Sequence, residues 1–570
     1  MFVLFLVFFV LFLINISRLC ILCVFQSEYY SDQARILHER ERKIKAARGI
    51  IYDRNGKVIA TNRSVCTISV IHSQITDPDK VIACLSRELN LSESYVRKRV
   101  EKVSAIEKVK SNVAKDTGDI IRSFELDGVK VDEDYTRYYP YDTLASKVIG
   151  FTGSDNQGII GLEAEYDEVL SGTEGRILAM TDARGVDLEA EGESRIEPIP
   201  GDNLYLTIDM NIQSYAAQLA QQALEQKSAD SVSIIVMNCK NGEILAMVNE
   251  PEFYLNQPFL LSEKLLSMQT DSNSQDLLNT MWRNGCINDT YEPGSTFKII
   301  TAAAALEEDI VNINSTFSCP GFIIVEDCKI RCHKVGGHGG ETFLQGTMNS
   351  CNPVFISVGL RLGAEKFYSY FQKWKLLEKT GVDLPGEATA IMQKKEAIGL
   401  VELATVSFGQ SFQVTPLGLL TAAATIVNGG TRVTPHLGLG TEENSTGVIT
   451  KLQFSVQEKM VSSETSETMR YILEQVVENG TGRNGYAEGF RVGGKTATSQ
   501  TLPRGSGKYI ASYIEFTPAN DPDLIAIAII HNPKGVYYGG QVAAPLIRQL
   551  FQNILPYLDG IDYNEQWSEQ

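Results

Sequence analysis

The chain has 570 residues, of which 43% are hydrophobic and 21% are charged, and its formal net charge is −18 at pH 7. Because this length exceeds one ordinary domain, we expect two or three folded units, each with enough apolar residues for a core. The composition excludes a largely disordered chain, and the acidic surplus argues against a nucleic-acid-binding protein, which needs a basic face for phosphates.

The first segment of the chain is almost entirely apolar. Only Asn15 is strongly polar in residues 1–16, and the apolar character resumes after Arg18 through Phe25. About 24 residues of this kind can span a bilayer as a helix. A cleaved signal peptide is the alternative, but no charged segment precedes the run and no small-x-small motif ends it. We therefore predict a transmembrane anchor over residues 1–26.

Residues 27–47 form a charged, helix-prone segment, which predicts a helical stalk. The basic residues on this side of the span favour the cytoplasm by the positive-inside rule, although long domains often translocate regardless of local charge. The ten cysteines form neither a dense disulfide framework nor a regular set of Cys-x-x-Cys pairs. Neither the basic residues nor the cysteines settle on which side of the membrane the folded domains lie.

A β-rich N-terminal domain is expected over residues 48–195. In residues 48–62, two alternating strands flank an Asn55–Gly56 turn, which predicts a hairpin. The segment 79–110 is predicted to be helical.

A polar stretch at residues 186–202 marks the boundary to a second unit. This unit begins with a strand, a helix and a strand pair, and a strand–turn–strand pattern returns over residues 509–531. Strands that bracket a long helical middle predict an α+β fold, with an antiparallel sheet and flanking helices over residues 200–556. A C-terminal tail of residues 557–570 follows.

One segment of this second unit carries the candidate chemistry. A Pro-Gly pair breaks the chain immediately before Ser295 and a helix-forming run follows from Thr296, so Ser295 lies at a helix N-terminus that favours a developing negative charge. Lys298 lies one turn further on the same face, and a buried lysine with a lowered pKa can serve as the base for a serine nucleophile. Taken alone, Ser-x-x-Lys is equally compatible with a capping serine and an ordinary helix lysine.

Two downstream motifs favour the catalytic interpretation. Ser350 lies 55 residues after Ser295 and, with Asn352, offers a hydroxyl for proton relay and an amide for a substrate. Lys495 and Thr496, in a strand-like segment, could present a cation and a hydroxyl to a carboxylate. The three elements in this order predict a serine acyl-transferase.

This order resembles the motif set of penicillin-binding proteins and β-lactamases. The sequence resembles the class B penicillin-binding proteins more specifically, and within them it is most similar to the sporulation branch. The segments that resemble the transpeptidase domain of this family include YEPGSTFK, NSCNPVF, VSFGQSFQVTPL, GTGRNGYAEGFRVGGKT and YGGQVAAPL, and those that resemble its pedestal are RGIIYDRNGKVIATN and GIIGLEAEYDEVLSG.

The resemblance implies a peptidoglycan D,D-transpeptidase with a serine β-lactamase-like catalytic domain, and a pedestal or dimerisation-like domain over residues 48–195. Ser295 would attack the penultimate D-Ala carbonyl of a donor stem peptide and form an acyl-enzyme. Lys298 would take and return the proton, and Ser350 would pass it to the leaving amine. An acceptor amine would then resolve the ester, and β-lactams would acylate the same serine.

The resemblance also implies how the substrate is held. Asn352 would bind the donor amide, and Lys495 with Thr496 would bind the terminal carboxylate. The backbone N–H groups of Ser295 and Thr498 would stabilise the oxyanion.

The remaining implications concern location and partners. The catalytic domain is expected outside the cytoplasmic membrane on a single-pass anchor, in cell-wall or spore-cortex synthesis. Since residues 48–195 do not resemble a glycosyltransferase, a separate glycan polymerase of the SEDS family is an expected partner by analogy. No cofactor, no metal and no nucleic acid is expected.

One position departs from the family pattern. The Lys-Thr-Gly element ends in Ala497 here, and the extra methyl group could narrow the approach of substrate to the strand. Two alternatives to the transpeptidase therefore stay open: a D,D-carboxypeptidase or β-lactamase-like hydrolase that uses water as the acceptor, and a non-catalytic penicillin-binding scaffold.

Residues 489–496 also match the phosphate-loop pattern G-x-x-x-x-G-K-T. A phosphate loop must open a helix, whereas Pro503, Gly505 and Gly507 follow this segment closely and disfavour a long helix. We do not expect a nucleotide site.

The cysteines near Ser350 allow two further interpretations. Cys328, Cys332, His333 and His338 are spaced unlike the usual zinc motifs, which speaks against a metal site of these four residues. Cys332 and Cys351 could instead form a disulfide in an oxidising compartment and make activity depend on redox state, or stay as two buried free thiols.

Overall fold

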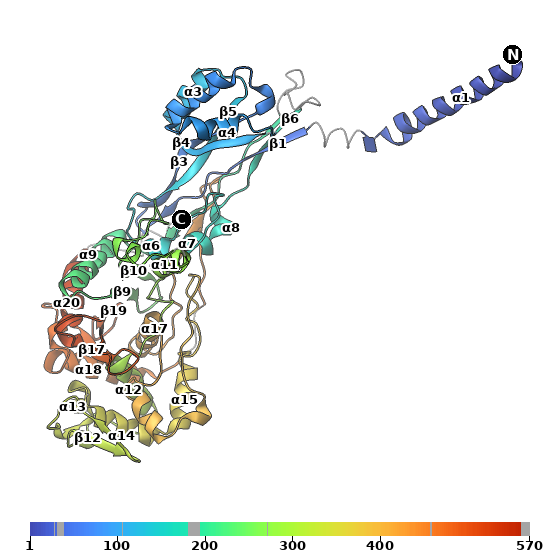
Figure 1. The fold of residues 1–570 in the computed structure, drawn as a ribbon. Helices are drawn as coiled ribbons and strands as arrows, with labels where there is room; N and C mark the ends of the chain where they lie inside the picture. The colour runs from blue at the N-terminus through green and yellow to red at the C-terminus, as the bar shows by residue number, and fades with distance from the viewer. Residues whose placement is uncertain are drawn as a thin grey trace. The chain divides into compact units, whose positions relative to one another are not determined.

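The computed structural model describes residues 1–27, 29–30, 39–104, 106–180, 194–270, 272–455 and 459–559 (Figure 1). Its internal contacts divide the chain into two compact units. Unit 1 comprises Met1–Gly49, Asn62–Tyr138 and Ser171–Gly201, and unit 2 comprises Ile50–Thr61, Tyr139–Leu170 and Asp202–Gln570.

The N-terminal apolar segment is helical. Helix α1 (Phe2–Cys20) continues into one π-helical turn, η1 (Ile21–Phe25), and together they give 24 residues with a mean hydropathy of 2.5. A helix of this length extends for about 36 Å, which matches the thickness of a bilayer core. By length and composition this segment can cross a membrane once, as the sequence predicts.

The helical stalk expected over residues 27–47 needs correction in its second part. Glu39–Ile44 form strand β1, which pairs antiparallel with β6 (Gly175–Met180), and β6 pairs with β7 (Ser194–Ile196). Pairing with β6 satisfies backbone N–H and C=O groups of β1, and this overrides the helix propensity of its charged residues. Most of residues 28–38, like residues 181–193 of the predicted boundary segment, lies outside the described part of the chain.

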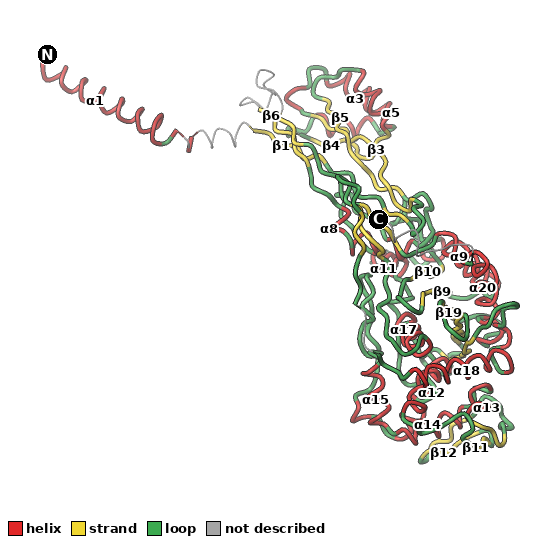
Figure 2. Tube along the Cα trace, turned by 180° about the vertical axis from the view of Figure 1, so that it is seen from behind, coloured by secondary structure: helices red, strands yellow, loops and turns green. Residues whose placement is uncertain are grey.

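The rest of unit 1 places helices against strands (Figure 2). A small core joins the later part of β3 (Val58–Val70) and β4 (Glu107–Ala114) to apolar residues of the neighbouring helices. The predicted helix over 79–110 is confirmed as far as residue 100, but residues 107–110 belong to β4. The remaining elements of this unit are α3 (Pro78–Leu89), α4 (Glu93–Val100), α5 (Lys115–Ser123), β5 (Val129–Tyr138) and the short η2 (His72–Gln74).

Unit 2 is built on a five-stranded antiparallel sheet with the order β10-β9-β19-β18-β17. The strands are β9 (Ser231–Asn238), β10 (Ile244–Glu250), β17 (Gly493–Gln500), β18 (Tyr509–Thr517) and β19 (Leu524–His531). The predicted strand pair over 509–531 is confirmed, and β17, which carries the Lys-Thr motif, lies at the edge of the sheet.

Both faces of this sheet are buried, which explains its nearly continuous apolar strands. In β9, Val232, Ile234 and Val236 belong to one core cluster, together with residues of α9 (Met210–Gln226) and α20 (Ala544–Leu558). Ile235 and Met237 alternate with them and belong to the cluster that contains residues of α12 (Lys298–Glu307), α17 (Pro416–Val427) and α18 (Ser463–Asn479). The α+β class with an antiparallel sheet is therefore confirmed.

A second sheet of unit 2 runs in the order β16-β15-β8-β2 and continues into the first residues of β3. Its strands are β2 (Ile51–Tyr52), β8 (Asn203–Leu206), β15 (Gly438–Glu442) and β16 (Ile449–Lys451). The predicted hairpin at Asn55–Gly56 is confirmed by the antiparallel pairing of β2 with β3 and by the positive φ of Gly56, +79°.

The other elements of unit 2 are mostly helical. They are α6 (Ser146–Ile149), α7 (Gly161–Glu165), α8 (Asp167–Leu170), α10 (Glu263–Leu266), α11 (Ser274–Trp282), η3 (Gly294–Phe297), α12 (Lys298–Glu307), β11 (Thr316–Cys319), β12 (Phe322–Val325), β13 (Cys328–Arg331), β14 (Gly339–Thr342), α13 (Phe343–Met348), α14 (Asn352–Leu362), α15 (Ala364–Lys373), η4 (Lys395–Ala397), α16 (Leu400–Val406), α17 (Pro416–Val427), α18 (Ser463–Asn479), η5 (Arg483–Gly485) and α19 (Gly539–Val542).

The two units differ from the linear boundaries expected from the sequence. Residues 50–61 and 139–170 lie inside the predicted N-terminal domain, yet their contacts place them in unit 2. Strand β2 shows the reason, because it pairs in parallel with β8 of the same unit. Of the predicted tail, residues 557–559 are described, and Leu558 is the last residue of α20.

Candidate active site

Ser295 lies in a tight turn between an extended segment and helix α12. The turn is the short 3-10 helix η3, which begins at Gly294 with a φ of +58°, a left-handed conformation that glycine adopts readily. The Gly294 N–H donates to the carbonyl of Gly409 over 2.9 Å. Gly294 and Thr296 are buried whereas Ser295 is partly exposed, so the turn presents the Ser295 side chain to solvent.

Lys298, the first residue of α12, points into the protein. Its side chain is fully buried, and Nζ donates to the Ser350 carbonyl (2.7 Å), to Ser350 Oγ (3.3 Å) and to Asn352 Oδ1 (2.8 Å). Burial lowers the pKa of Lys298 to about 7, although the nearby thiols of Cys351 and Cys332 act in the opposite direction. A substantial fraction of this amine is therefore neutral near pH 7 and able to accept a proton.

Ser350 connects the two lysines of the site. Its backbone has a φ of +52°, an unusual value for a residue other than glycine, and its N–H donates to the Thr347 carbonyl at the end of α13. Ser350 Oγ accepts from Lys298 and, over 2.9 Å, from Lys495 Nζ. With both lone pairs occupied, the hydroxyl hydrogen is directed toward a further acceptor.

Strand β17 supplies the other side of the site. Lys495 is fully buried, and burial together with the charge of Lys298 lowers its pKa well below the usual value. Ser499 Oγ donates to the Glu292 carbonyl over 2.9 Å, and the Gly539 N–H donates to Thr498 Oγ1 over 3.0 Å. The first bond fixes β17 beside the turn that carries Ser295, and the second joins β17 to the first residue of α19 (Gly539–Val542).

A cleft of about 940 Å³ lies over these residues. Among the residues predicted from sequence, it is lined by Ser295, Cys332, Ser350, Asn352, Thr496 and Thr498. Lys298, Lys495 and Cys351 are buried next to these lining residues. The structure thus brings together all the residues of the three predicted motifs.

Ala497 also lines this cleft and is 4% exposed. A Cβ atom added at Gly294 would lie 3.5 Å from its methyl group, so Ala497 faces the catalytic turn. The departure from the family motif therefore lies within the site.

Several residues in the cleft or next to it were missed in the sequence analysis. Glu292, which directly precedes the Pro-Gly pair, is buried and pairs with Arg504 over 3.0 Å, while its Oε1 also accepts from the Ser411 N–H over 2.9 Å. Gln410 and Arg483 lie in segments that resemble the family, so the resemblance could have predicted this part of the cleft lining. Other lining residues are Arg331, His333, Asn484, Tyr509, Tyr537 and Tyr538.

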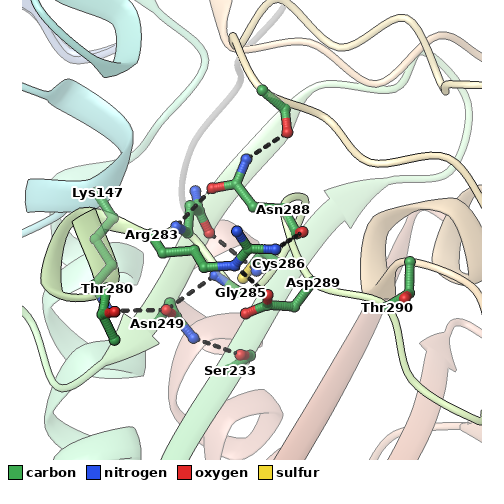
Figure 3. A network of polar contacts seen from close by, with 12 residues as sticks. Lys147, Ser233, Asn249, Thr280, Arg283, Gly285, Cys286, Asn288, Asp289 and Thr290 are labelled. Carbon is green, nitrogen blue, oxygen red and sulfur yellow. Dashed lines mark hydrogen bonds and ion pairs between the residues drawn. The ribbon is translucent and has the colours of Figure 1, made fainter. Parts of the chain in front are cut away.

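The segment before the catalytic turn is held by a buried polar network (Figure 3). Asn249 of β10 is its centre: Oδ1 accepts from Lys147 Nζ (2.9 Å) and from the Gly285 N–H (3.0 Å), and Nδ2 donates to Ser233 Oγ (2.8 Å). Burial lowers the pKa of Lys147. The network ties the sheet to the chain that leads to Ser295.

We expect Asn249→Ala to lower the free energy of unfolding by about 2–3 kcal/mol, because the buried Lys147 and Gly285 donors lose this acceptor. Thermal unfolding of the full-length chain in detergent measures the effect as a fall of several degrees in Tm. The matched control is Asn279→Ala on the exposed side of α11, which should change stability by less than about 0.5 kcal/mol. Equal Tm values for the two variants would contradict the role of the network.

The cysteines near Ser350 form a compact group. Cys332 and Cys351, the predicted redox pair, are both buried and free, and their sulfur atoms lie within 4.8 Å of each other and of Cys319 Sγ and a ring nitrogen of His338. Cys328 is exposed and does not belong to this group.

Two family models match the chain. The penicillin binding protein transpeptidase domain matches residues 232–552, and the penicillin-binding protein dimerisation domain matches residues 43–206.

Individual proteins show the same likeness. Stage V sporulation protein D of Bacillus subtilis (strain 168) is 39% identical, over 97% of this chain and 86% of that protein. Peptidoglycan D,D-transpeptidase FtsI of Escherichia coli (strain K12) is 27% identical, over 90% of this chain and 84% of that protein. The crystal structure of penicillin binding protein 2X from Streptococcus thermophilus superposes with a TM-score of 0.75 at 23% identity, over 93% of this chain and 82% of that chain, and so supports the fold.

Proposed function

Because this chain belongs to the class B penicillin-binding proteins, we propose that it is a peptidoglycan D,D-transpeptidase that cross-links stem peptides through an acyl-enzyme on Ser295. The observation that supports this best is the convergence of Ser295, Lys298, Ser350 and Lys495 on one cleft. The expected likeness to the sporulation branch is confirmed by the 39% identical relative, and the role is cell-wall or spore-cortex synthesis.

In the acylation step, Ser295 Oγ bonds to the penultimate D-Ala carbonyl carbon and the peptide C–N bond breaks. The Ser295 proton passes to the neutral amine of Lys298, and Ser350 relays a proton to the leaving D-Ala amine. Within the described residues, none of the hydrogen bonds of Lys298 goes to Ser295. The contact between the two must therefore form when substrate fills the cleft, as catalytic hydrogen bonds often do.

Substrate binding uses the other side chains of the cleft. Asn352 would hold the donor amide, and Lys495 with Thr496 would hold the terminal carboxylate, whose negative charge favours the protonated form of the buried lysine. The N–H groups of Ser295 and Thr498 would receive the oxyanion. The edge position of β17 supports this role, because alternate N–H groups of an edge strand are not used by a neighbouring strand.

Two other functions use the same residues. A D,D-carboxypeptidase or β-lactamase-like hydrolase would resolve the ester with water, and a scaffold would bind penicillin without turning over stem peptides. Ala497 in the cleft is the observation behind the second alternative.

The lifetime of the penicillin ester separates the transpeptidase from the hydrolase. We expect the full-length chain, labelled with a fluorescent penicillin and freed of excess label, to retain most of the label for longer than an hour. Gel fluorescence against time measures this loss. Decay within minutes would support the hydrolase, because it requires efficient attack by water on the ester.

The proposed location follows from the anchor and the substrate. The helix α1–η1 would hold the chain in the cytoplasmic membrane as a single span, with unit 2 on the outer side, where peptidoglycan is cross-linked. A SEDS-family polymerase would supply the glycan strands. β-Lactams would act as substrate analogues at Ser295.

A further inference from the structure

Four potential metal ligands from four separate segments of unit 2 converge beside the cleft. Cys319 ends β11, Cys332 follows β13, His338 precedes β14 and Cys351 separates α13 from α14. One ligand atom of each lies within 4.8 Å of the others. We propose that these residues bind a structural zinc ion, a site that the sequence analysis did not predict.

The arrangement suits tetrahedral zinc. With Zn–S bonds of about 2.3 Å and Zn–N bonds of about 2.0 Å, neighbouring ligand atoms of a tetrahedral site lie about 3.5–3.8 Å apart. Cys332 Sγ and His338 Nδ1 are 3.6 Å apart, and the widest separation in the group needs to close by only about 1 Å. Three thiolates and one imidazole form a common structural zinc set, and such soft ligands disfavour magnesium or calcium.

Backbone hydrogen bonds already hold three of the ligands in place. The Cys332 N–H donates to the Gly321 carbonyl (2.8 Å), the His338 N–H to the Cys319 carbonyl (3.0 Å) and the Cys351 N–H to the Gly346 carbonyl (2.8 Å). Binding therefore requires side-chain adjustment more than backbone movement.

An unsatisfied carboxylate next to the group supports a bound cation independently. The side chain of Glu341 is 3% exposed, and its Oε1 has no hydrogen-bond partner and lies 3.9 Å from His338 Nδ1. The other oxygen, Oε2, accepts from Asn349 Nδ2 over 3.0 Å. A buried carboxylate oxygen without a partner is costly, and a cation at short range would lower that cost.

The two sheets around the group are small. Strands β11 and β14 form one two-stranded sheet and β12 and β13 form another, with four residue pairs in each. Such small sheets are marginal alone, and a metal that links four segments would add to the stabilisation that they gain from the core of unit 2.

The metal would also fix residues of the cleft. Cys351 lies between Ser350 and Asn352, and the Asn352 amide donates to the carbonyl of Arg331, the residue before Cys332. Zinc on Cys332 and Cys351 would hold the segment that carries Ser350 and Asn352, the two residues that accept from Lys298. The site itself does not depend on the proposed reaction.

The same sulfur atoms allow a competing state. A disulfide between Cys332 and Cys351 would consume two ligands, so the predicted redox pair and a bound zinc ion exclude each other. His333 also competes, because its Nδ1 lies 3.8 Å from Cys332 Sγ. Cys319 discriminates between these states, since it is a ligand of the metal but no part of that disulfide.

The test measures zinc in the full-length chain, purified in detergent with a thiol reductant from zinc-supplemented cells. We expect about one zinc per chain in the wild type and in Cys328→Ser and His333→Ala, and at least a fivefold loss in Cys319→Ser and His338→Ala. If a ligand variant does not fold, replacement by Co²⁺ in the wild type gives a second readout, the thiolate charge-transfer and intense d–d absorption of a tetrahedral cobalt–sulfur site.

Three outcomes would overturn the proposal: wild type that holds no zinc and takes none up on titration, full zinc content in Cys319→Ser, or iron or copper in place of zinc. Because elemental analysis does not depend on acylation, a failed penicillin-labelling experiment would leave this result intact.

Discussion

Replacing Ser295 by alanine should abolish covalent labelling of the full-length chain by a fluorescent penicillin. The ester needs the Ser295 oxygen, and the second serine hydroxyl that lines the cleft, on Ser350, already accepts hydrogen bonds from two lysines. We expect the acylation rate constant to fall by at least about 10³-fold, as removal of a nucleophile does in other serine enzymes. Gel fluorescence after timed exposure to the label measures it.

The control for this experiment is Ser369→Ala, an exposed serine on α15. It should label at the rate of the wild type, and both variants should keep the wild-type Tm. Labelling of Ser295→Ala at a rate close to that of the wild type would refute the assignment of Ser295 as the nucleophile.

The acylation rate should rise with pH through about 7, because acylation needs the neutral form of Lys298, whose pKa burial lowers to about 7. Below this pKa the protonated amine cannot accept the Ser295 proton, so the rate falls as pH falls. Between pH 8 and pH 6 we expect a loss of roughly tenfold. Labelling with the fluorescent penicillin for fixed times at each pH measures the rate profile.

Lys298→Arg tests the cause of this profile. Arginine keeps the positive charge but does not lose its proton in this pH range, so we expect acylation to fall by about 10²–10⁴-fold and its dependence on pH near 7 to disappear. Lys394→Arg, at an exposed position, should keep the wild-type profile. A wild-type rate that does not change between pH 6 and pH 8 would contradict the role of Lys298 as the base.

The sequence predicted the members of the site better than their contacts. The Pro-Gly pair before Ser295 and the strand-like segment with Lys495 are local patterns, and the structure contains the turn and the strand that they predict. The partners of Lys298 did not follow from helical spacing, because they come from residues more than 50 positions away. The left-handed backbone conformation of Ser350 could not be predicted either, because Ser-Cys-Asn contains no glycine to indicate a positive φ.

Tertiary pairing explains the other differences. Charged Glu39–Ile44 looked helical, but its partner strand β6 is far away in sequence. Cys319 was overlooked as a possible ligand for a similar reason, because it is 13 residues from Cys332 and meets it only when the two small sheets form. The group considered from the sequence contained Cys328 instead, which is exposed.

The interleaved course of the chain limits how the catalytic part can be separated from the rest. A fragment that starts at residue 202 would lack β2, the neighbour of β8, and would also lack Lys147 of the network around Asn249. Truncation of the chain at a single position therefore removes segments of unit 2 itself. A soluble enzyme for biochemistry is better obtained by deleting the membrane helix and keeping everything from β1 onward.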